Sequence, residues 1–361
     1  MKILITGTHF TSALAVLEEL KKYEDIKLIY AGRNTTREGD SSKSVESEVL
    51  PKYGIKFIPV IAGRLQKAFT IYTIPSLLKL PIGFIQAFVI FLKEKPDVIL
   101  SFGGYVSVPI VMVGWLFSIP IIIHEQTLIT GLANKICSWF ADKVAISFKE
   151  SSLSRNPKAI LTGNPIRAEI IQNGSAQNMH TSVPTVLITG GNQGSHVINL
   201  AVEESLDELL RITEVIHQTG DSKYKDHERL SKLENKRYHV QKWIENMGDT
   251  MKKVDLVVTR AGINTLLELA YLGKPALVIP IPYLYQDEQN KNAKYFEKLG
   301  LVKILPQNKL NGENLLKEIN HCLKNLDQLK KNAQKAKDII IPDSAKRVAL
   351  ETILLAERQR V

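Results

Sequence analysis

Four short segments rich in glycine and small polar residues follow apolar runs in this chain. They are TGTHFTS (6–12), FGGYVS (102–107), TGGNQGS (189–195) and RAGINT (260–265). Glycine lets backbone N–H groups approach a ligand closely, and the helix that follows offers unpaired N–H groups and a partial positive charge. A diphosphate is the ligand that suits this combination.

The alternative is that these segments are ordinary strand-to-helix turns, which tolerate glycine at any position. The presence of four such segments, two in each half of the chain, favours ligand binding instead. No G-K-[ST] follows any of them, as a Walker A loop requires, and TGTHFTS does not match G-x-G-x-x-G. ATP hydrolysis and dinucleotide binding are therefore both disfavoured.

Glu268 has two interpretations. Thr265-Leu-Leu-Glu268 matches a capping box, in which the Glu accepts a hydrogen bond from the Thr265 backbone N–H. Alternatively, the carboxylate accepts hydrogen bonds from a ribose diol, as acidic residues do in nucleotide-binding folds. Spacing alone favours the capping box.

Apolar strands alternate with amphipathic helices along the chain. Strands are expected at 2–6, 26–32, 55–60, 97–102, 120–124, 143–147, 185–191, 213–220, 238–244, 254–258, 275–282 and 301–305, and helices at 12–23, 77–93, 106–117, 131–140, from about 195, and at 342–359. Alternation with short turns implies parallel strands that are covered on both faces, with ligands at the carboxyl ends of the strands.

A polar segment rich in glycine, asparagine and serine, 163–184, divides the pattern into two series. The chain is also longer than one core usually supports. We therefore predict an α/β chain with two Rossmann-like domains, 1–164 and 165–341, whose parallel sheets face each other across a cleft. A C-terminal helix in 342–361 is expected to pack back across the domains.

Composition limits the class of protein. The net charge of +10 favours an anionic partner, such as nucleic acid, a phosphorylated substrate or a membrane surface. Cys137 and Cys322 lie far apart without a CxxC or a Cys/His cluster, so neither a disulfide nor a zinc site is expected, and a reducing cytoplasm fits. Prolines interrupt the apolar segments 77–92 and 106–123, so no transmembrane helix is predicted, and 1–10 has no cleavage signal.

The segment TRAGINTLLELAYLGKPALVIPIP (259–282), followed by DEQNKNA (287–293), resembles the nucleotide-sugar signature of family 28 glycosyltransferases. The likeness continues in SFGGYVSVP (101–109), IIHEQ (122–126), GLANK (131–135), LTGNPIR (161–167), ITGGNQGS (188–195) and HQTG (217–220). The order and spacing of these motifs make the resemblance specific. It implies the GT-B fold, inversion at the anomeric carbon, and no metal or other cofactor.

The resemblance further implies a UDP-GlcNAc site in the second domain, and with it a ribose-binding role for Glu268. In the family's D-H-Q-x-x-N-A run, Glu288 here takes the place of the histidine. The implied donor contacts are Arg167 near the diphosphate or sugar, Gly191, Asn192, Gln193 and Gly194 around the phosphates, Ile244 at the uracil, Thr265 at a phosphate, Glu268 at the ribose and Gln289 at the GlcNAc hydroxyls.

The implied reaction is attack by the 4-hydroxyl of N-acetylmuramic acid in lipid I on C1 of GlcNAc. This step needs a base, and His9, in the turn after the first strand, is the first choice because its unperturbed pKa lies near neutrality. His9 can alternatively cap the helix or bind the acceptor diphosphate. Glu125 is the rival base and His124 is expected to be a buried hydrogen-bonding residue. Gly103, Gly104 and Tyr105 complete the expected substrate-binding residues.

Because lipid I is anchored in the bilayer, the resemblance places the protein peripherally at the cytoplasmic face of the cell membrane. Basic and apolar residues are mixed in 63–86, which suits docking on an anionic inner leaflet. The alternative is that the apolar ones belong to the core. The residues are Arg64, Lys67, Lys79, Phe69, Ile71, Tyr72, Ile74, Leu77, Leu78 and Phe84. A nucleic-acid partner is not expected, because no binding motif is present.

Other functions stay open at this point. The loop TGTHFTS lacks two glycines of the family's G-G-T-G-G-H pattern, and Asn192 and Thr127 also depart from it, so the acceptor can be a different lipid-linked molecule. A non-catalytic nucleotide-sugar-binding scaffold is a second alternative. A nonhydrolysing UDP-GlcNAc epimerase is disfavoured, because it would not need the 63–86 surface.

Overall fold

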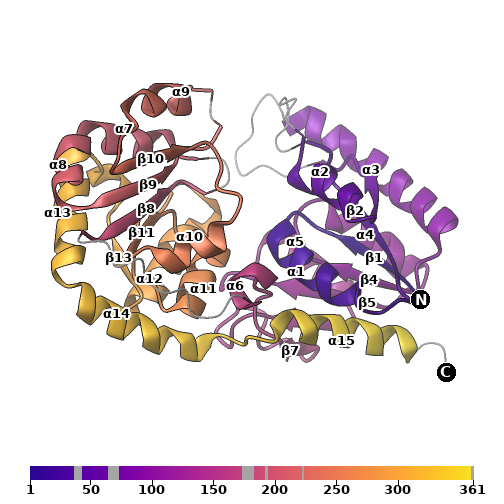
Figure 1. The fold of residues 1–361 in the computed structure, drawn as a ribbon. Coiled ribbons are helices and arrows are strands. Elements are labelled where there is room, and N and C mark those ends of the chain that lie inside the picture. The colour runs from indigo at the N-terminus through magenta and orange to yellow at the C-terminus, as the bar shows by residue number, and fades with distance from the viewer. Residues whose placement is uncertain (36–42, 64–72, 173–182, 192–193, 222, 359–361) are drawn as a thin grey trace. The chain divides into compact units, whose positions relative to one another are not determined.

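The computed structural model describes residues 1–361 except 36–42, 64–72, 173–182, 192–193, 222 and 359–361 (Figure 1). The chain divides into two compact units, Met1–Arg167 with Ile341–Val361, and Ala168–Ile340. The division therefore falls after Arg167 rather than after residue 164, and the C-terminal segment belongs to the first unit.

The first unit contains a parallel sheet of seven strands in the order β3-β2-β1-β4-β5-β6-β7. Its elements are β1 (Lys2–Thr6), α1 (Phe10–Leu20), β2 (Lys27–Gly32), α2 (Val45–Lys52), β3 (Lys56–Pro59), α3 (Thr73–Glu94), β4 (Val98–Ser101), α4 (Ser107–Leu116), β5 (Ile121–Glu125), α5 (Leu132–Phe140), β6 (Lys143–Ile146), β7 (Ala159–Leu161) and α15 (Ser344–Glu357).

Both faces of this sheet are covered, because successive side chains of a strand point to opposite faces. Ile3 and Ile5 pack in one cluster with residues of α1 and α15, whereas Leu4 packs in another with residues of α3, α4 and α5. The buried positions Val348, Ala349 and Leu355 give α15 an apolar stripe toward α1, β4 and β5. This packing explains why the C-terminal helix belongs to the first unit.

The second unit contains a parallel sheet of six strands in the order β10-β9-β8-β11-β12-β13. Its elements are α6 (Ala168–Gln172), β8 (Thr185–Thr189), α7 (His196–Glu204), α8 (Leu206–Ile212), β9 (Glu214–Gln218), α9 (Asp226–Leu230), η1 (Ser231–Leu233), β10 (Tyr238–Gln241), α10 (Met247–Lys253), β11 (Leu256–Thr259), α11 (Ile263–Leu272), β12 (Ala276–Val278), η2 (Tyr285–Asp287), α12 (Glu288–Lys298), β13 (Val302–Ile304), η3 (Gln307–Lys309), α13 (Gly312–Lys324), α14 (Leu326–Lys335) and η4 (Ala336–Ile339).

Each unit has the predicted Rossmann-like α/β architecture, and every expected strand is present. The edge strand β7 and the short helix α2 are among the elements that were not predicted. The polar segment 163–184 is not a plain linker, because α6 lies within it and packs on α10. No helix among the described residues has the length and apolar character needed to cross a membrane.

Candidate active site

The loops that follow β1 and β4 interlock at the carboxyl edge of the first sheet. The Thr8 N–H donates to the Gly103 carbonyl at 2.9 Å. Gly103 and Gly104 have φ of +70° and +85°, and a Cβ at Gly104 would lie 2.1 Å from Thr8 Oγ1. Glycine is therefore required at Gly104 for both conformation and space. The half-buried Tyr105 follows at the same edge.

His9 is the half-buried residue that precedes α1, and its side chain makes no capping hydrogen bond. The capping interpretation is therefore wrong. Its Nδ1 lies 2.8 Å from Nε2 of Gln126. Burial and, to a smaller extent, the nearby positive charge of Arg33 lower the pKa of His9 to about 4. The ring is thus neutral near pH 7, the state in which a histidine can accept a proton.

Gln126 is a residue that the sequence analysis missed as a partner of His9. It is buried and its Oε1 accepts a hydrogen bond from Ser12 Oγ at 3.2 Å. Ser12 Oγ also lies 3.4 Å from Asn164 Oδ1, in the GNPIR motif. The only signal for this role was the position of Gln126 in the HEQ motif at the end of β5. The contacts link the His9 ring to two other strand-end loops.

Glu125 has different surroundings from His9. It is 2% exposed, and one carboxylate oxygen accepts from the Thr127 N–H at 2.9 Å and from its hydroxyl at 2.6 Å. The other oxygen accepts from Asn134 Nδ2 at 3.0 Å. These contacts favour a loop-ordering role for Glu125. His124 is buried and its Nε2 lies 3.2 Å from the Gly163 carbonyl, as expected for a buried hydrogen-bonding residue.

The glycine loop after β8 in the second unit closes tightly against the end of β9. Gly194 has φ of +71°, and a Cβ there would lie 1.9 Å from the Thr219 carbonyl oxygen. A Cβ at Gly190 would lie 2.3 Å from the Ser195 nitrogen. Gly191 has φ of +83° and open space around it. The predicted phosphate contacts of Asn192 and Gln193 lie outside the described residues.

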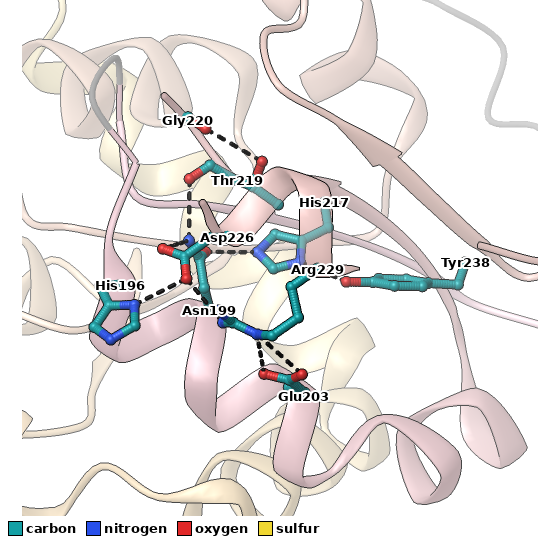
Figure 2. Close-up of polar contacts among 9 residues, drawn as sticks. All are labelled: His196, Asn199, Glu203, His217, Thr219, Gly220, Asp226, Arg229 and Tyr238. Atoms are coloured by element: carbon teal, nitrogen blue, oxygen red, sulfur yellow. Dashed lines mark hydrogen bonds and ion pairs between the residues drawn. The ribbon is translucent and has the colours of Figure 1, made fainter. Parts of the chain in front are cut away.

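A polar network with a buried centre contacts the residues directly after β9 (Figure 2). Asn199 Nδ2 donates to the Thr219 carbonyl and to the Asp226 carboxylate, both at 3.0 Å, so its Oδ1 accepts from His217 Nε2 at 3.0 Å. Burial lowers the pKa of His217 to about 3, so this ring is neutral. Thr219, the residue that Gly194 approaches, is therefore held in place. The remaining members are His196, Glu203, Gly220, Arg229 and Tyr238.

Arg260, directly after β11, is a second residue that the sequence analysis missed. It is 8% exposed, and its guanidinium donates to Ser195 Oγ at 2.7 Å and to the Ile279 carbonyl at 2.9 Å. Burial lowers its pKa to about 10, so it stays charged at pH 7. Ser195 precedes α7. A positive charge therefore lies beside the glycine loop and the start of this helix, where an anion is favoured.

The capping box at Thr265 and Glu268 is not formed. Helix α11 begins at Ile263 with Gly262 as its N-cap, so Thr265 already lies inside the first turn. Glu268 is one turn further along and 4% exposed. A capping box needs the Thr at the N-cap itself, so the spacing-based interpretation was wrong. The ribose-binding role of Glu268, which the resemblance implies, stays a prediction.

The segment before α12 carries backbone strain. Gln286 and Asp287 have φ of +48° and +58°, a conformation that residues other than glycine rarely adopt and that clusters at functional sites. Gln289 follows in the first turn, and its Oε1 accepts from the Ile281 N–H at 3.0 Å. Burial raises the pKa of the neighbouring Glu288. The predicted sugar-binding residue Gln289 thus lies directly after a conformationally constrained turn.

Two further predicted donor residues are Ile244 and Arg167. Ile244 follows β10, is buried, and its N–H donates to Gln218 Oε1 at 2.9 Å. Arg167 is half-buried and is the last residue of the first unit before the chain enters the second. Among the described residues, no group of three or more His, Cys, Asp or Glu side chains could hold a metal ion.

An exposed apolar surface covers parts of three helices in the first unit. Ring contacts between Phe88 and Phe117, and between Trp115 and Phe140, connect α3, α4 and α5. Leu116 and Trp139 are 70% and 68% exposed, which is unusual for side chains of this size. We call this surface the α3–α5 patch; its exposed members are Ile82, Ile85, Phe88, Val89, Leu92, Trp115, Leu116, Leu132 and Trp139.

The α3–α5 patch only partly matches the predicted docking segment. Within 63–86 the residues Arg64, Lys67, Phe69, Ile71 and Tyr72 lie outside the described residues, as do the side chains of Ile74, Leu77 and Leu78. Lys79 and Phe84 are half-buried. The helix expected at 106–117 exposes Trp115 and Leu116 at its C-terminal end. The contributions of α4 and α5 to this surface were not predicted from the sequence.

Comparison with known proteins identifies the family. The model of the glycosyltransferase family 28 N-terminal domain matches residues 4–146, and that of the C-terminal domain matches 185–348. The chain belongs to glycosyltransferase family 28. It is 35% identical over 349 residues, 93% of this chain and 95% of the relative, to the UDP-N-acetylglucosamine--N-acetylmuramyl-(pentapeptide) pyrophosphoryl-undecaprenol N-acetylglucosamine transferase of Clostridium botulinum strain 657. A Bacillus cytotoxicus protein of the same name is 33% identical, covering 96% of this chain and 97% of that one.

Solved structures of related fold cover nearly all of this glycosyltransferase. Acinetobacter baumannii MurG superposes with a TM-score of 0.74 at 23% identity, covering 98% of this chain and 99% of that one. A putative UDP-N-acetylglucosamine 2-epimerase from Listeria monocytogenes gives 0.68 at 17% identity, covering 96% and 94%. Such likeness confirms the predicted GT-B fold and does not separate a transferase from an epimerase.

Proposed function

We propose that this protein transfers N-acetylglucosamine from UDP-GlcNAc to the 4-hydroxyl of N-acetylmuramic acid in lipid I, giving lipid II. The observation that carries the proposal is identity of 35% across 93% of the chain to a relative whose name states this transfer. The epimerases among the structural neighbours lie below 20% identity and share only the fold. The transferase is therefore the function that the site should be able to perform.

The donor occupies the carboxyl edge of the second sheet in this proposal. The glycine loop and the start of α7 receive the diphosphate, and the Arg260 charge beside Ser195 favours the negative charge that grows on departing UDP. Thr265 contacts a phosphate at the start of α11. The buried Glu268 accepts from the ribose hydroxyls. Ile244 contacts the uracil.

The sugar and the acceptor complete the reaction centre. Gln289 binds GlcNAc hydroxyls, and Arg167 reaches the donor from the first unit. His9 accepts the proton of the attacking 4-hydroxyl while the new bond to C1 forms and the bond from C1 to the UDP oxygen breaks. A single displacement of this type inverts the anomeric carbon. Gly103, Gly104 and Tyr105 lie at the same edge as His9 and contact the acceptor.

The α3–α5 patch places the protein on the membrane in this proposal. The exposed Lys93 and Lys135 lie on the same helices as Leu92 and Trp139. Apolar side chains next to basic ones suit peripheral binding to anionic lipid. The first unit thereby meets the bilayer-anchored acceptor at the cytoplasmic face of the cell membrane.

The test is transfer of radiolabelled GlcNAc by the purified full-length protein. Labelled UDP-GlcNAc is incubated with lipid I and, in parallel, with other polyprenyl-diphosphate-linked sugars. Label appearing in lipid II, with turnover on lipid I at least about tenfold above the other acceptors, supports the proposal. Preferred transfer to another acceptor would show that lipid I is not the main substrate. Donor binding without transfer would show that the protein is a non-catalytic scaffold.

A further inference from the structure

Gln218, the last residue of β9, lies between two segments of the proposed donor site. Its side chain is 1% exposed. Its Oε1 accepts from the Ile244 N–H at 2.9 Å, and its Nε2 donates to the Gly191 carbonyl at 3.1 Å. A further contact joins Nε2 to Thr189 Oγ1 at 3.3 Å. One amide therefore connects the segment after β10 with the glycine loop after β8.

The orientation of this amide follows from its partners. A backbone N–H can only donate and a backbone carbonyl can only accept, so the oxygen must face Ile244 and the nitrogen must face Gly191. Glutamine has both a donor and an acceptor at its end, whereas an ionised glutamate of the same length can only accept. Methionine has a similar length and offers neither donor nor strong acceptor, so it would leave both buried backbone groups without this partner.

We propose that Gln218 is a positioning residue, which holds the uracil-facing segment at Ile244 and the diphosphate loop at Gly191 in a fixed relation. This inference rests on the proposed function, because only there do both segments contact the donor. Gln218 acts through them rather than on the ligand. Holding the two segments in place before binding lowers the ordering cost for a ligand that spans both.

A ligand that contacts both segments should therefore depend on Gln218 more than one that contacts a single segment. UDP spans the uracil and diphosphate positions, whereas uridine reaches only the first. Loss of the Gln218 amide should weaken the binding of UDP more than the binding of uridine. Because ground state and transition state share these donor contacts, the loss should raise KM for UDP-GlcNAc and leave kcat nearly unchanged.

The test compares full-length Gln218→Met and Gln218→Asn variants with the wild type, using calorimetry with uridine and with UDP. Asparagine keeps the amide but retracts it by one methylene, so it provides a polar second variant. We expect Kd for UDP to rise about ten- to hundredfold and Kd for uridine by at most about threefold. At saturating UDP-GlcNAc, kcat should stay within about threefold. Gln241→Met on β10 is the matched control, because Gln241 is exposed, and it should bind both ligands as the wild type does.

Amide hydrogen exchange in the ligand-free protein checks the contact itself. The Ile244 N–H should lose protection in Gln218→Met and keep it in Gln241→Met. Folded Gln218 variants that bind UDP within twofold of the wild type would overturn the inference. An unchanged Kd combined with a smaller fraction of protein able to bind UDP would also overturn the inference, because that result indicates a purely structural role for Gln218. Failure of the wild type to bind UDP would overturn the proposed function and this inference together.

Discussion

His9 follows β1 and Glu125 is the last residue of β5. Their surroundings separate these two residues, which the sequence analysis treated as rival bases. Glu125 accepts hydrogen bonds from three donors and is almost fully buried. His9 is half-buried, and its Nδ1 faces a single amide, that of Gln126. A base must reach the proton that it removes, so the geometry favours His9.

Replacing His9 with alanine should therefore lower kcat by about a hundredfold or more while KM for UDP-GlcNAc stays within about threefold. The reason is that the ring acts on the acceptor hydroxyl and not on the donor. Steady-state transfer assays measure both constants. His239→Ala provides the control, because His239 is exposed on β10. Near-normal turnover in His9→Ala would remove this residue as the base.

The pH dependence of transfer provides a separate prediction for His9. Burial and the charge of Arg33 lower its pKa to about 4, so the ring is unprotonated above that value. A base loses activity as it becomes protonated. We expect kcat/KM to be flat between about pH 6 and pH 8 and to fall only as the pH approaches 4. A His9-dependent decline centred near 6.5, the value of an exposed histidine, would contradict this account.

At the scale of elements, the glycine loop after β8 depends on its close approach to β9. Gly194 and Gly54 share φ of +71°, but a Cβ at Gly194 would lie 1.9 Å from the Thr219 oxygen, whereas Gly54 has open space. Gly194→Ala should raise Kd for UDP-GlcNAc about tenfold or more, because the loop must move, and Gly54→Ala should leave it unchanged. Both variants introduce the same backbone strain and only Gly194→Ala introduces a steric clash. Calorimetry on the two variants therefore separates the effect of the clash on affinity from the effect of the strain. Equal affinities would show that the loop does not form the phosphate site.

The α3–α5 patch leads to a prediction for membrane binding. Leu116→Glu combined with Trp139→Glu should reduce binding to anionic phospholipid vesicles about tenfold, because two exposed apolar side chains become charged. UDP-GlcNAc affinity in detergent-free buffer should be unchanged. Vesicle co-sedimentation measures the first quantity and calorimetry the second. Undiminished sedimentation of the double variant would exclude this surface as the membrane contact.

The strands of both sheets could be predicted from the sequence, except for one edge strand. The helix cap and the side-chain partners at the site could not. Long apolar runs such as 97–102 and 185–191 specify buried parallel strands, because both of their faces are covered. Strand β7 has only three half-buried residues at a sheet edge, so it leaves no such run. The capping box failed because Gly262, not Thr265, precedes the helix. Gln126 and Arg260 were missed because their roles depend on partners distant in sequence.

At the scale of the whole molecule, each of the two units places its glycine-containing turns at the carboxyl edge of its own parallel sheet. The family assignment and the fold rest on nearly the whole chain. The C-terminal helix α15 returns to the first unit, so the second unit is a continuous insertion, Ala168–Ile340, between two parts of the first. This topology connects the first unit to both ends of the second.

The central claim is that the two units act together as an inverting GlcNAc transferase on lipid I. Incubation with UDP-GlcNAc labelled with ¹³C at the anomeric carbon, followed by NMR of the lipid product, tests it most directly. The account predicts a β-linked GlcNAc on the 4-hydroxyl of N-acetylmuramic acid, with one UDP released per linkage. An α-linkage, free GlcNAc as the main product, or epimerised UDP-sugar without any lipid product would contradict it.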